Sequence, residues 1–341
     1  MRTIAGKLWA FVRRHCEALW VVVSVVFPII LRTRARPVIF SKWSGIGDII
    51  CTFPAALELK KRHPGSVFIY NCHPEYTCLP RLAGVTDLTA SFQNIGLVGH
   101  RYKFLFTAFY DFPCADEREN DFCKDYVVKE YASDHSVVVD DAHPQMEIPP
   151  VALERANNIL KSHLSLNSRL VVIQTGPSWP IREWPMAAWV GLIAELKKSP
   201  EITVVQIGTD HQLAVGRREV PTLPSVVSLV NKLSLEDSCA IISKSQLFIG
   251  IDSGMLHIAA ALQVPCVGIF GPTSPNLRLP ARDVKNCVIS RIQCQGCHHR
   301  VPRIHWEKGC PYDAACMKNI SVNEVFEKCA RLLSLATSPI R

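Results

Sequence analysis

An aspartate stands behind two closely spaced glycines in the stretch FSKWSGIGDII, residues 40–50. The run before the glycines has the pattern of a strand, and the run after them has the pattern of a helix. A dinucleotide-binding turn would need a third glycine at position 50, where the chain has Ile50. We therefore interpret Gly45 and Gly47 as a tight turn that places Asp48 in the first turn of a helix. An ordinary helix cap would look the same, and a general base needs the same ionised carboxylate.

A second polar turn follows the strand that ends at Ile251, in the stretch IGIDSGMLHIAAAL, residues 249–262. The free backbone N–H groups at the start of the next helix form an anion site suited to a phosphate. His257, in the first turn, could donate to a phosphate oxygen. The plainer alternative is that Asp252 caps the helix and that His257 is an ordinary histidine. The candidate residues here are Asp252, Ser253, Gly254, Met255 and His257.

A third polar loop, QTGPSWPIREWP at residues 174–185, also follows an apolar run. Ser178 offers a hydroxyl group, and Arg182 offers a guanidinium group suited to pyrophosphate. An arginine on a solvated loop would be unremarkable by itself. A fourth loop, GTDHQ at residues 208–212, is expected at the same edge of the sheet.

The elements that must position these loops alternate between short Val/Ile-rich strands and helical patterns, which predicts an α/β fold of two doubly wound domains. In such sheets ligands bind beyond the carboxyl ends of the strands. A proline-rich break at residues 140–150 divides the chain, whereas the aromatic-rich residues 93–135 give no clear pattern. The predicted parts are an N-terminal membrane-association segment 1–37, an acceptor-binding domain 38–150 and a nucleotide-sugar-binding domain 151–341 with a cysteine cluster.

Read in order, these segments resemble glycosyltransferase family 9, the ADP-heptose:lipopolysaccharide heptosyltransferases. The resemblance covers roughly residues 38 to 335. It rests on the glycine turn with Asp48, Pro54 and Leu57, on GPSWPIREWP and LSLEDSCAII, and above all on IDSGMLHIAAALQVPCVGIFGPTSP.

The resemblance implies a GT-B fold and an inverting, metal-independent transfer of a heptose from ADP-heptose to a lipopolysaccharide-core acceptor. Asp48 would be the general base. Ser178 and Arg182 match the phosphate-contacting loop, Leu233 would line the nucleotide base, and residues 252–257 match the donor-binding turn. Two alternatives remain: the same fold could use another nucleotide-sugar or another acceptor, or the chain could be a non-catalytic scaffold.

The net charge of +8 suits nucleic acid, an anionic membrane surface or phosphorylated substrates. No basic run with interleaved aromatic residues supports nucleic acid. Arginines flank the apolar run ALWVVVSVVFPIIL, residues 18–31, which is short for a bilayer span and contains Pro28. A helix packed on the protein itself is the simplest interpretation. We favour an interfacial or re-entrant anchor, and so a cytoplasmic protein held on the inner face of the inner membrane; a short span stays open.

Fourteen cysteines in a chain of this length do not indicate a disulfide framework. Four of them have the spacing C-x2-C-x12-C-x5-C, namely Cys294, Cys297, Cys310 and Cys316. This spacing fits a structural zinc site with no part in catalysis, with His298, His299 or His305 as substitute ligands. Four reduced thiols are an equally good interpretation.

Overall fold

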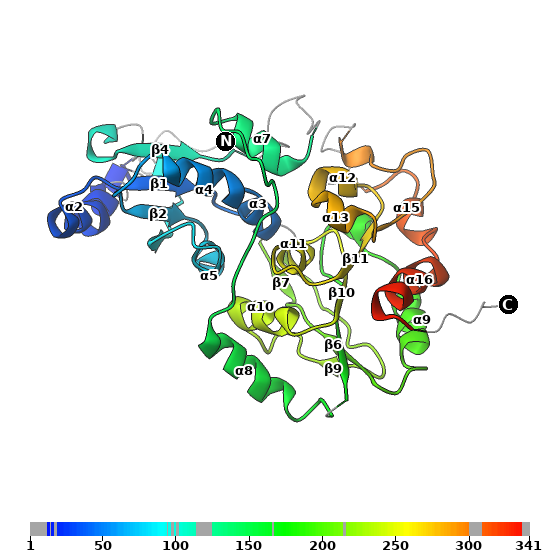
Figure 1. Cartoon of the computed structure of the whole chain (residues 1–341). Helices are drawn as coiled ribbons and strands as arrows, with labels where there is room; N and C mark the ends of the chain where they lie inside the picture. Colours follow the sequence, from blue (N-terminus) through cyan, green and yellow to red (C-terminus); the bar gives the residue numbers. More distant parts are fainter. Residues whose placement is uncertain are drawn as a thin grey trace.

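The computed structural model describes residues 12–13, 15–16, 19–93, 95–96, 99, 102–113, 125–165, 167–213, 216–299 and 309–335. Within these ranges the chain forms two parallel β-sheets flanked by helices, and the two sheets lie side by side (Figure 1). The α/β class predicted from the alternation of strands and helices is therefore confirmed.

The first sheet has the strand order β3-β2-β1-β4, with all neighbours parallel. Its elements are β1 (Val38–Ser41), β2 (Phe68–Asn71), β3 (Leu88–Ala90), β4 (Ala108–Asp111), α3 (Ile46–Cys51), α4 (Phe53–Lys61), η2 (Pro74–Tyr76), α5 (Cys78–Leu82), η3 (Lys103–Leu105) and α7 (Val127–Ser133). Successive residues of a strand point to opposite faces of the sheet. Phe40 accordingly packs in the core under α3 and α4, whereas Ile39 packs in a separate cluster on the other face.

The other face of this sheet is covered by the N-terminal helical segment, η1 (Val22–Val26) followed by α2 (Phe27–Thr33). Pro28 has no N–H group and clashes with the carbonyl four residues earlier in a regular helix. The wider π-turn just before it relieves this conflict, and the Phe27 N–H donates to the Val22 carbonyl, five residues back. Val21, Val22 and Val26 are buried against the sheet, so this face of the helix packs on the protein. No helix in the described part of the chain is long and apolar enough to cross a membrane.

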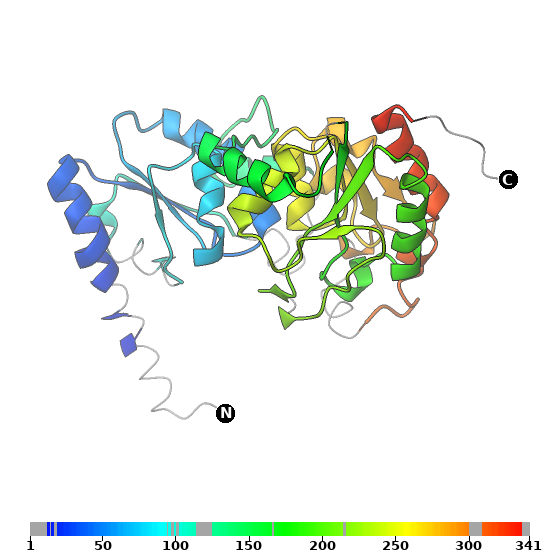
Figure 2. The ribbon, with the colours of Figure 1, turned by 90° about the horizontal axis from the view of Figure 1, so that it is seen from below.

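The second sheet has the order β12-β11-β10-β5-β6-β9, again with parallel neighbours, and a short β7-β8 hairpin stands apart from it. Its strands are β5 (Arg169–Gln174), β6 (Ile202–Gln206), β7 (His211–Gln212), β8 (Gly216–Arg217), β9 (Val227–Ser228), β10 (Leu247–Ile251), β11 (Cys266–Phe270) and β12 (Val288–Ile289). Its helices are α8 (Pro150–Leu160), η5 (Pro180–Arg182), α9 (Met186–Leu196), α10 (Leu235–Ser243), α11 (Gly254–Ala261), α12 (Pro275–Arg278), α13 (Ala281–Val284), η6 (Cys297–His299), α15 (Ala315–Lys318) and α16 (Val322–Leu333). The C-terminal α16 packs on α9, on the side away from the first sheet (Figures 1 and 2).

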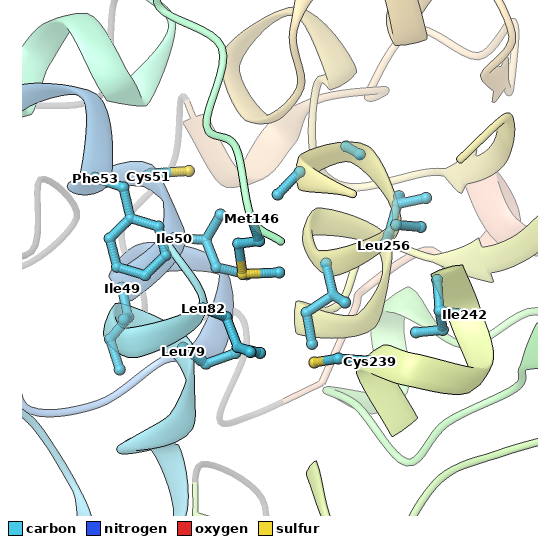
Figure 3. Packing of buried hydrophobic residues seen from close by; sticks show 14 of the residues in the cluster. Ile49, Ile50, Cys51, Phe53, Leu79, Leu82, Met146, Cys239, Ile242 and Leu256 are labelled. Atoms are coloured by element: carbon cyan, nitrogen blue, oxygen red, sulfur yellow. The ribbon is translucent and has the colours of Figure 1, made fainter. Parts of the chain in front are cut away.

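The two halves meet through an apolar interface in which α3 packs against α11. Figure 3 shows side chains of α3, α5, α10 and α11 in this cluster, with Met146 of the connecting segment among them. The connecting segment is hydrogen bonded to both halves, because the Met146 N–H donates to the Ala261 carbonyl and the Glu147 N–H donates to the Leu82 carbonyl. The interface therefore fixes the carboxyl edges of the two sheets relative to each other.

Candidate active site

The turn between β1 and α3 carries Asp48. Gly45 precedes the helix with φ of 87°, a backbone conformation that favours glycine. A Cβ atom on Gly45 would also collide with the Asp48 carboxylate. Both the backbone conformation and the space around the carboxylate therefore require glycine here. Asp48 is partly exposed, in the first turn of α3.

Two glycines allow this turn to lie directly on the donor turn predicted in the second half of the chain. A Cβ atom added to Gly47 would lie 2.6 Å from Cδ2 of His257, and one added to Gly254 would lie 2.5 Å from Cβ of Ile46. Both distances are shorter than any ordinary contact between carbon atoms. Helices α3 and α11 can approach this closely only because each carries a glycine at the contact. The structure thus brings the Asp48 turn and residues 252–257 together.

Asp252, which follows β10, is a buried carboxylate close to two arginines. Its Oδ2 atom lies 3.3 Å from Nη1 of Arg182, which belongs to the η5 turn. Burial by itself would raise the pKa of Asp252, but the guanidinium groups of Arg182 and Arg278 outweigh burial and hold that pKa at about 2. The carboxylate is therefore ionised at every physiological pH, and it orients the guanidinium groups near the N-terminus of α11.

His257 lies within the interface, with its ring against the first helix of the other half. Its Nδ1 atom is 3.7 Å from Sγ of Cys51, and its Nε2 atom is 4.0 Å from Oδ1 of Asp252. Burial lowers the pKa of His257, and this outweighs the opposing effect of Asp252. The ring is therefore neutral at pH 7. Its hydrogen bond to a phosphate stays a prediction, whereas its packing on Gly47 is a feature of the fold.

The loop that carries Ser178 is held by an ion pair. Glu183 accepts hydrogen bonds from the Ser178 N–H at 2.9 Å and from both terminal nitrogens of Arg218, at 2.7 and 3.0 Å. The same guanidinium group donates to the Ser178 carbonyl at 2.9 Å. Such a two-pronged pair fixes geometry as well as charge. Ser178 is itself buried, and its backbone is held in place by these hydrogen bonds with Glu183 and Arg218.

The remaining predicted residues lie around the same edge of the second sheet. The Ser253 hydroxyl donates to Oε1 of Gln174 at the end of β5, 2.8 Å away, and this links two neighbouring strand ends. Leu233 precedes the N-cap of α10, and both it and Met255 are half-buried against the core. The loop at 208–212 is held to Asn231, whose N–H donates to the Gly208 carbonyl.

Sequence reasoning missed three residues that the structure places near Asp252 and Ser253. Arg278 and Thr273 are buried in the segment after β11, and both help to lower the pKa of Asp252. Gln174 is buried and bonded to Ser253. A usable signal existed for Gln174 and Thr273, because they are polar residues that end or closely follow predicted strands at the edge where ligands bind.

The four cysteines near the C-terminus belong to a region that is hydrogen bonded to the segment after β11. Burial raises the pKa of Cys316 to about 11, and Cys297, Cys294 and Cys310 add to this rise, so the four thiols share one neighbourhood. Nevertheless, no three His, Cys, Asp or Glu side chains in the described ranges come close enough to hold a metal ion. The predicted zinc ligands are thus near one another without forming a ligand set.

Two of the three histidines named as substitute ligands, His298 and His299, are bonded to the segment after β11. The Ser274 N–H donates to Nε2 of His299, which places that nitrogen on the segment after β11. His298 is joined to the same segment through its backbone N–H, which donates to the Pro272 carbonyl. His305 lies outside the described residues.

Comparison with known proteins gives a match to one family model and to several relatives. The model of glycosyltransferase family 9 (heptosyltransferase) matches residues 83–305, a range that begins after Asp48. Lipopolysaccharide heptosyltransferase 3 of Escherichia coli is 30% identical over 131 residues, which are 38% of this chain and 38% of that protein. Lipooligosaccharide heptosyltransferase 2 of Haemophilus influenzae is 30% identical over 119 residues, 33% of this chain and 34% of that protein. The chain therefore matches little more than a third of the length of these relatives.

Solved structures resemble this chain over a larger part of its length than these relatives do. E. coli ADP-heptose LPS heptosyltransferase II superposes with a TM-score of 0.64 at 16% identity, covering 87% of this chain and 98% of that one. The iron-containing dodecameric glycosyltransferase TibC of enterotoxigenic E. coli superposes with a TM-score of 0.65 at 19% identity, covering 88% and 77%. The predicted GT-B fold is thereby confirmed. Since the family model matches well over half of its residues, the chain belongs to glycosyltransferase family 9, the heptosyltransferase family.

Proposed function

We propose that this protein transfers a heptose from ADP-heptose to a lipopolysaccharide-core acceptor, with inversion at the anomeric carbon. The observation that carries the proposal is the contact of Gly47 with His257, which sets the Asp48 turn on the donor turn at the end of β10. The relatives named above are lipopolysaccharide and lipooligosaccharide heptosyltransferases, and a TibC structure contains ADP-D-beta-D-heptose. Both support this choice of donor and acceptor.

In this mechanism Asp48 accepts the proton of the acceptor hydroxyl group. The acceptor oxygen then forms a bond to the anomeric carbon, and the bond from that carbon to the diphosphate breaks on the opposite side. Attack and departure on opposite faces produce inversion. The partial exposure of Asp48 leaves its carboxylate open to an incoming hydroxyl group.

The departing diphosphate gains negative charge, and the second half of the site supplies positive charge. Arg182 and Arg278 flank Asp252, which leaves a net positive charge beside the N–H groups at the start of α11. Fixed cationic and N–H groups of this kind stabilise charge that develops in a transition state. Ser178, held by Glu183 and Arg218, would contact the same phosphates, and Leu233 would pack on the nucleotide base.

The cysteine cluster has no step in this mechanism. A structural metal bound there would act only by holding residues 294–299 against the segment after β11. That segment is already bonded to the cluster, because the Gly296 N–H donates to the Gly271 carbonyl and the Gln295 amide donates to the Thr273 carbonyl.

A lipid-borne acceptor of this kind would place the enzyme at the cytoplasmic face of the inner membrane.

Nucleotide selectivity tests the donor assignment. Thermal melting of the purified protein would be measured with ADP, UDP, GDP and CDP, each with a chelator present. A ligand at about 100 times its dissociation constant stabilises the folded state by about 2.7 kcal/mol. We expect ADP alone to raise the melting temperature. A preference for UDP or GDP would move the function to another nucleotide-sugar, and no response to any nucleotide would support a scaffold.

A further inference from the structure

The N-terminal helical segment exposes a line of large apolar side chains. Leu19, Val23, Phe27 and Leu31 recur every four residues and are 51%, 60%, 46% and 74% exposed, and the neighbouring Trp20 is 60% exposed. We call these five residues the N-terminal ridge. Residues four apart lie on one side of a helix. A contiguous exposed apolar patch marks an interaction surface in soluble proteins.

The ridge is not needed to cover the sheet, because the opposite side of the same segment already does so. Val21, Val22 and Val26 are at most 4% exposed and pack with Ile39 and Ile69 of the first sheet. The segment is therefore apolar on two sides, one against the protein and one against the surroundings. A helix that served only the fold would carry polar residues on its outer side.

Positive charge adjoins the ridge at its C-terminal end. Arg32, Arg34 and Arg36 are exposed, and no aspartate or glutamate occurs from residue 18 to residue 47. Another exposed apolar side chain lies in η3, where Phe104 is 62% exposed next to the exposed Lys103. We call Lys103 and Phe104 the tip.

The tip is tied to the arginine segment by two hydrogen bonds. The Thr107 N–H donates to the Pro37 carbonyl at 2.9 Å, and the Thr107 hydroxyl donates to the Arg36 carbonyl at 2.8 Å. The tip and the arginine segment are therefore neighbours in the structure.

We propose that the N-terminal ridge lies in the interfacial layer of an anionic lipid bilayer, with the neighbouring arginines on lipid phosphates. Apolar side chains with a tryptophan enter the boundary between headgroups and acyl chains, while cations bind the headgroups. A second copy of the chain fits less well, because a symmetric contact through the ridge would bring two sets of arginines together. No helix within the described residues is long and apolar enough for a span.

This placement orients the enzyme. The ridge lies on the face of the first sheet away from α3, α4 and the second half of the chain (Figures 1 and 2). Docking through it leaves the face of the first sheet that carries α3 and α4 uncovered. The half proposed to bind the acceptor is then the half held at the lipid surface. The link to a lipid-borne acceptor rests on the proposed function; the docking surface does not.

Co-sedimentation with vesicles tests the surface. The full-length protein would be mixed with vesicles of phosphatidylethanolamine, with or without phosphatidylglycerol. We expect binding to the anionic vesicles, and we expect the double variant Val23→Ser/Leu31→Ser to bind at least about tenfold more weakly. Val138→Ser is the matched control, because Val138 is 82% exposed on the same half of the chain, and it should bind like the wild type.

The charge requirement is tested separately with Arg32→Gln/Arg36→Gln. Each arginine lost near an anionic surface should weaken binding about fivefold, with no change on neutral vesicles. Wild-type protein that stays in the supernatant, or ridge variants that bind as well as the wild type, would overturn the proposal. So would a ridge variant that changes the oligomeric mass without lipid, since the ridge would then be covered by a second copy. The ADP-induced rise in melting temperature should persist in every variant; its absence in the wild type would count against the proposed donor and leave the ridge untouched.

Discussion

Replacing Gly47 by alanine tests the contact that joins the two halves of the active site. The new methyl group would lie 2.6 Å from Cδ2 and 2.9 Å from Nε2 of His257. Carbon atoms in contact stand about 3.5 to 4.0 Å apart, so something must move by roughly 1 Å. His257 is buried among Cys51, Asp252 and α3 and has little room to yield. We therefore expect α3 and α11 to separate.

The expected loss of stability is modest and the expected loss of activity is large. Overpacking a core contact costs about 1–3 kcal/mol. Alanine in place of glycine in a helix stabilises by about 1 kcal/mol, so the net loss should be about 0–2 kcal/mol. A displacement of about 1 Å between reacting groups can slow a reaction about 100-fold. Because Asp48 moves with α3 and the donor moves with α11, kcat should fall far more than stability does.

The assay combines chemical unfolding with release of ADP during transfer, and it uses a double-mutant cycle. His257→Ala removes the ring that the new methyl group would meet. In that background Gly47→Ala should cost little stability, and it should not lower activity further. Gly254→Ala with Ile46→Gly forms a parallel cycle at the second contact, where the added Cβ would lie 2.5 Å from Cβ of Ile46. Unchanged kcat in Gly47→Ala, or an equal cost with and without the His257 ring, would refute the role assigned to this contact.

Three further predictions concern the buried charges and the donor loop. Asp252→Asn leaves the guanidinium groups of Arg182 and Arg278 without their shared anion, so unfolding by urea should show a loss of about 3–5 kcal/mol; an unchanged midpoint would contradict the ion pair. His257 has a lowered pKa in the folded state, so the unfolded chain binds its proton first, and the free energy of unfolding should decrease as pH falls below about 6.5. His257→Gln should flatten this dependence, and an equally steep curve would show that another group causes it. Glu183→Gln should raise the KM for the donor several-fold with a smaller change in kcat, and loss of kcat alone would show that the loop acts on chemistry and not on binding.

Much of the fold followed from the sequence because the strands of both sheets are short and apolar and are closed by glycine or polar turns. The strand expected before Gly45 is β1, and the helix expected after Gly47 is α3. β4 could not be assigned, because its residues lie in an aromatic-rich stretch that covers both faces of the sheet. The pairing of β4 with β1 is a tertiary contact that local patterns do not encode.

The candidate site was predictable where polar residues follow strands, and it was not predictable where helices from separate halves meet. The glycine turn and the donor turn were each visible as a motif. Nothing in either motif showed that Gly47 would contact His257. Arg278 was overlooked because it lies on α12, eight residues after β11 ends, and only the fold brings it to Asp252.

The most direct test of the proposed mechanism is the rate of heptose transfer by Asp48→Asn, measured as ADP released per enzyme in the presence of acceptor. Asparagine keeps the size of the side chain on the glycine turn and removes its ability to accept a proton. We predict that transfer falls by about 10²- to 10⁴-fold, while the ADP-induced rise in melting temperature matches that of the wild type. Turnover near the wild-type rate would show that Asp48 is not the base and would contradict the mechanism.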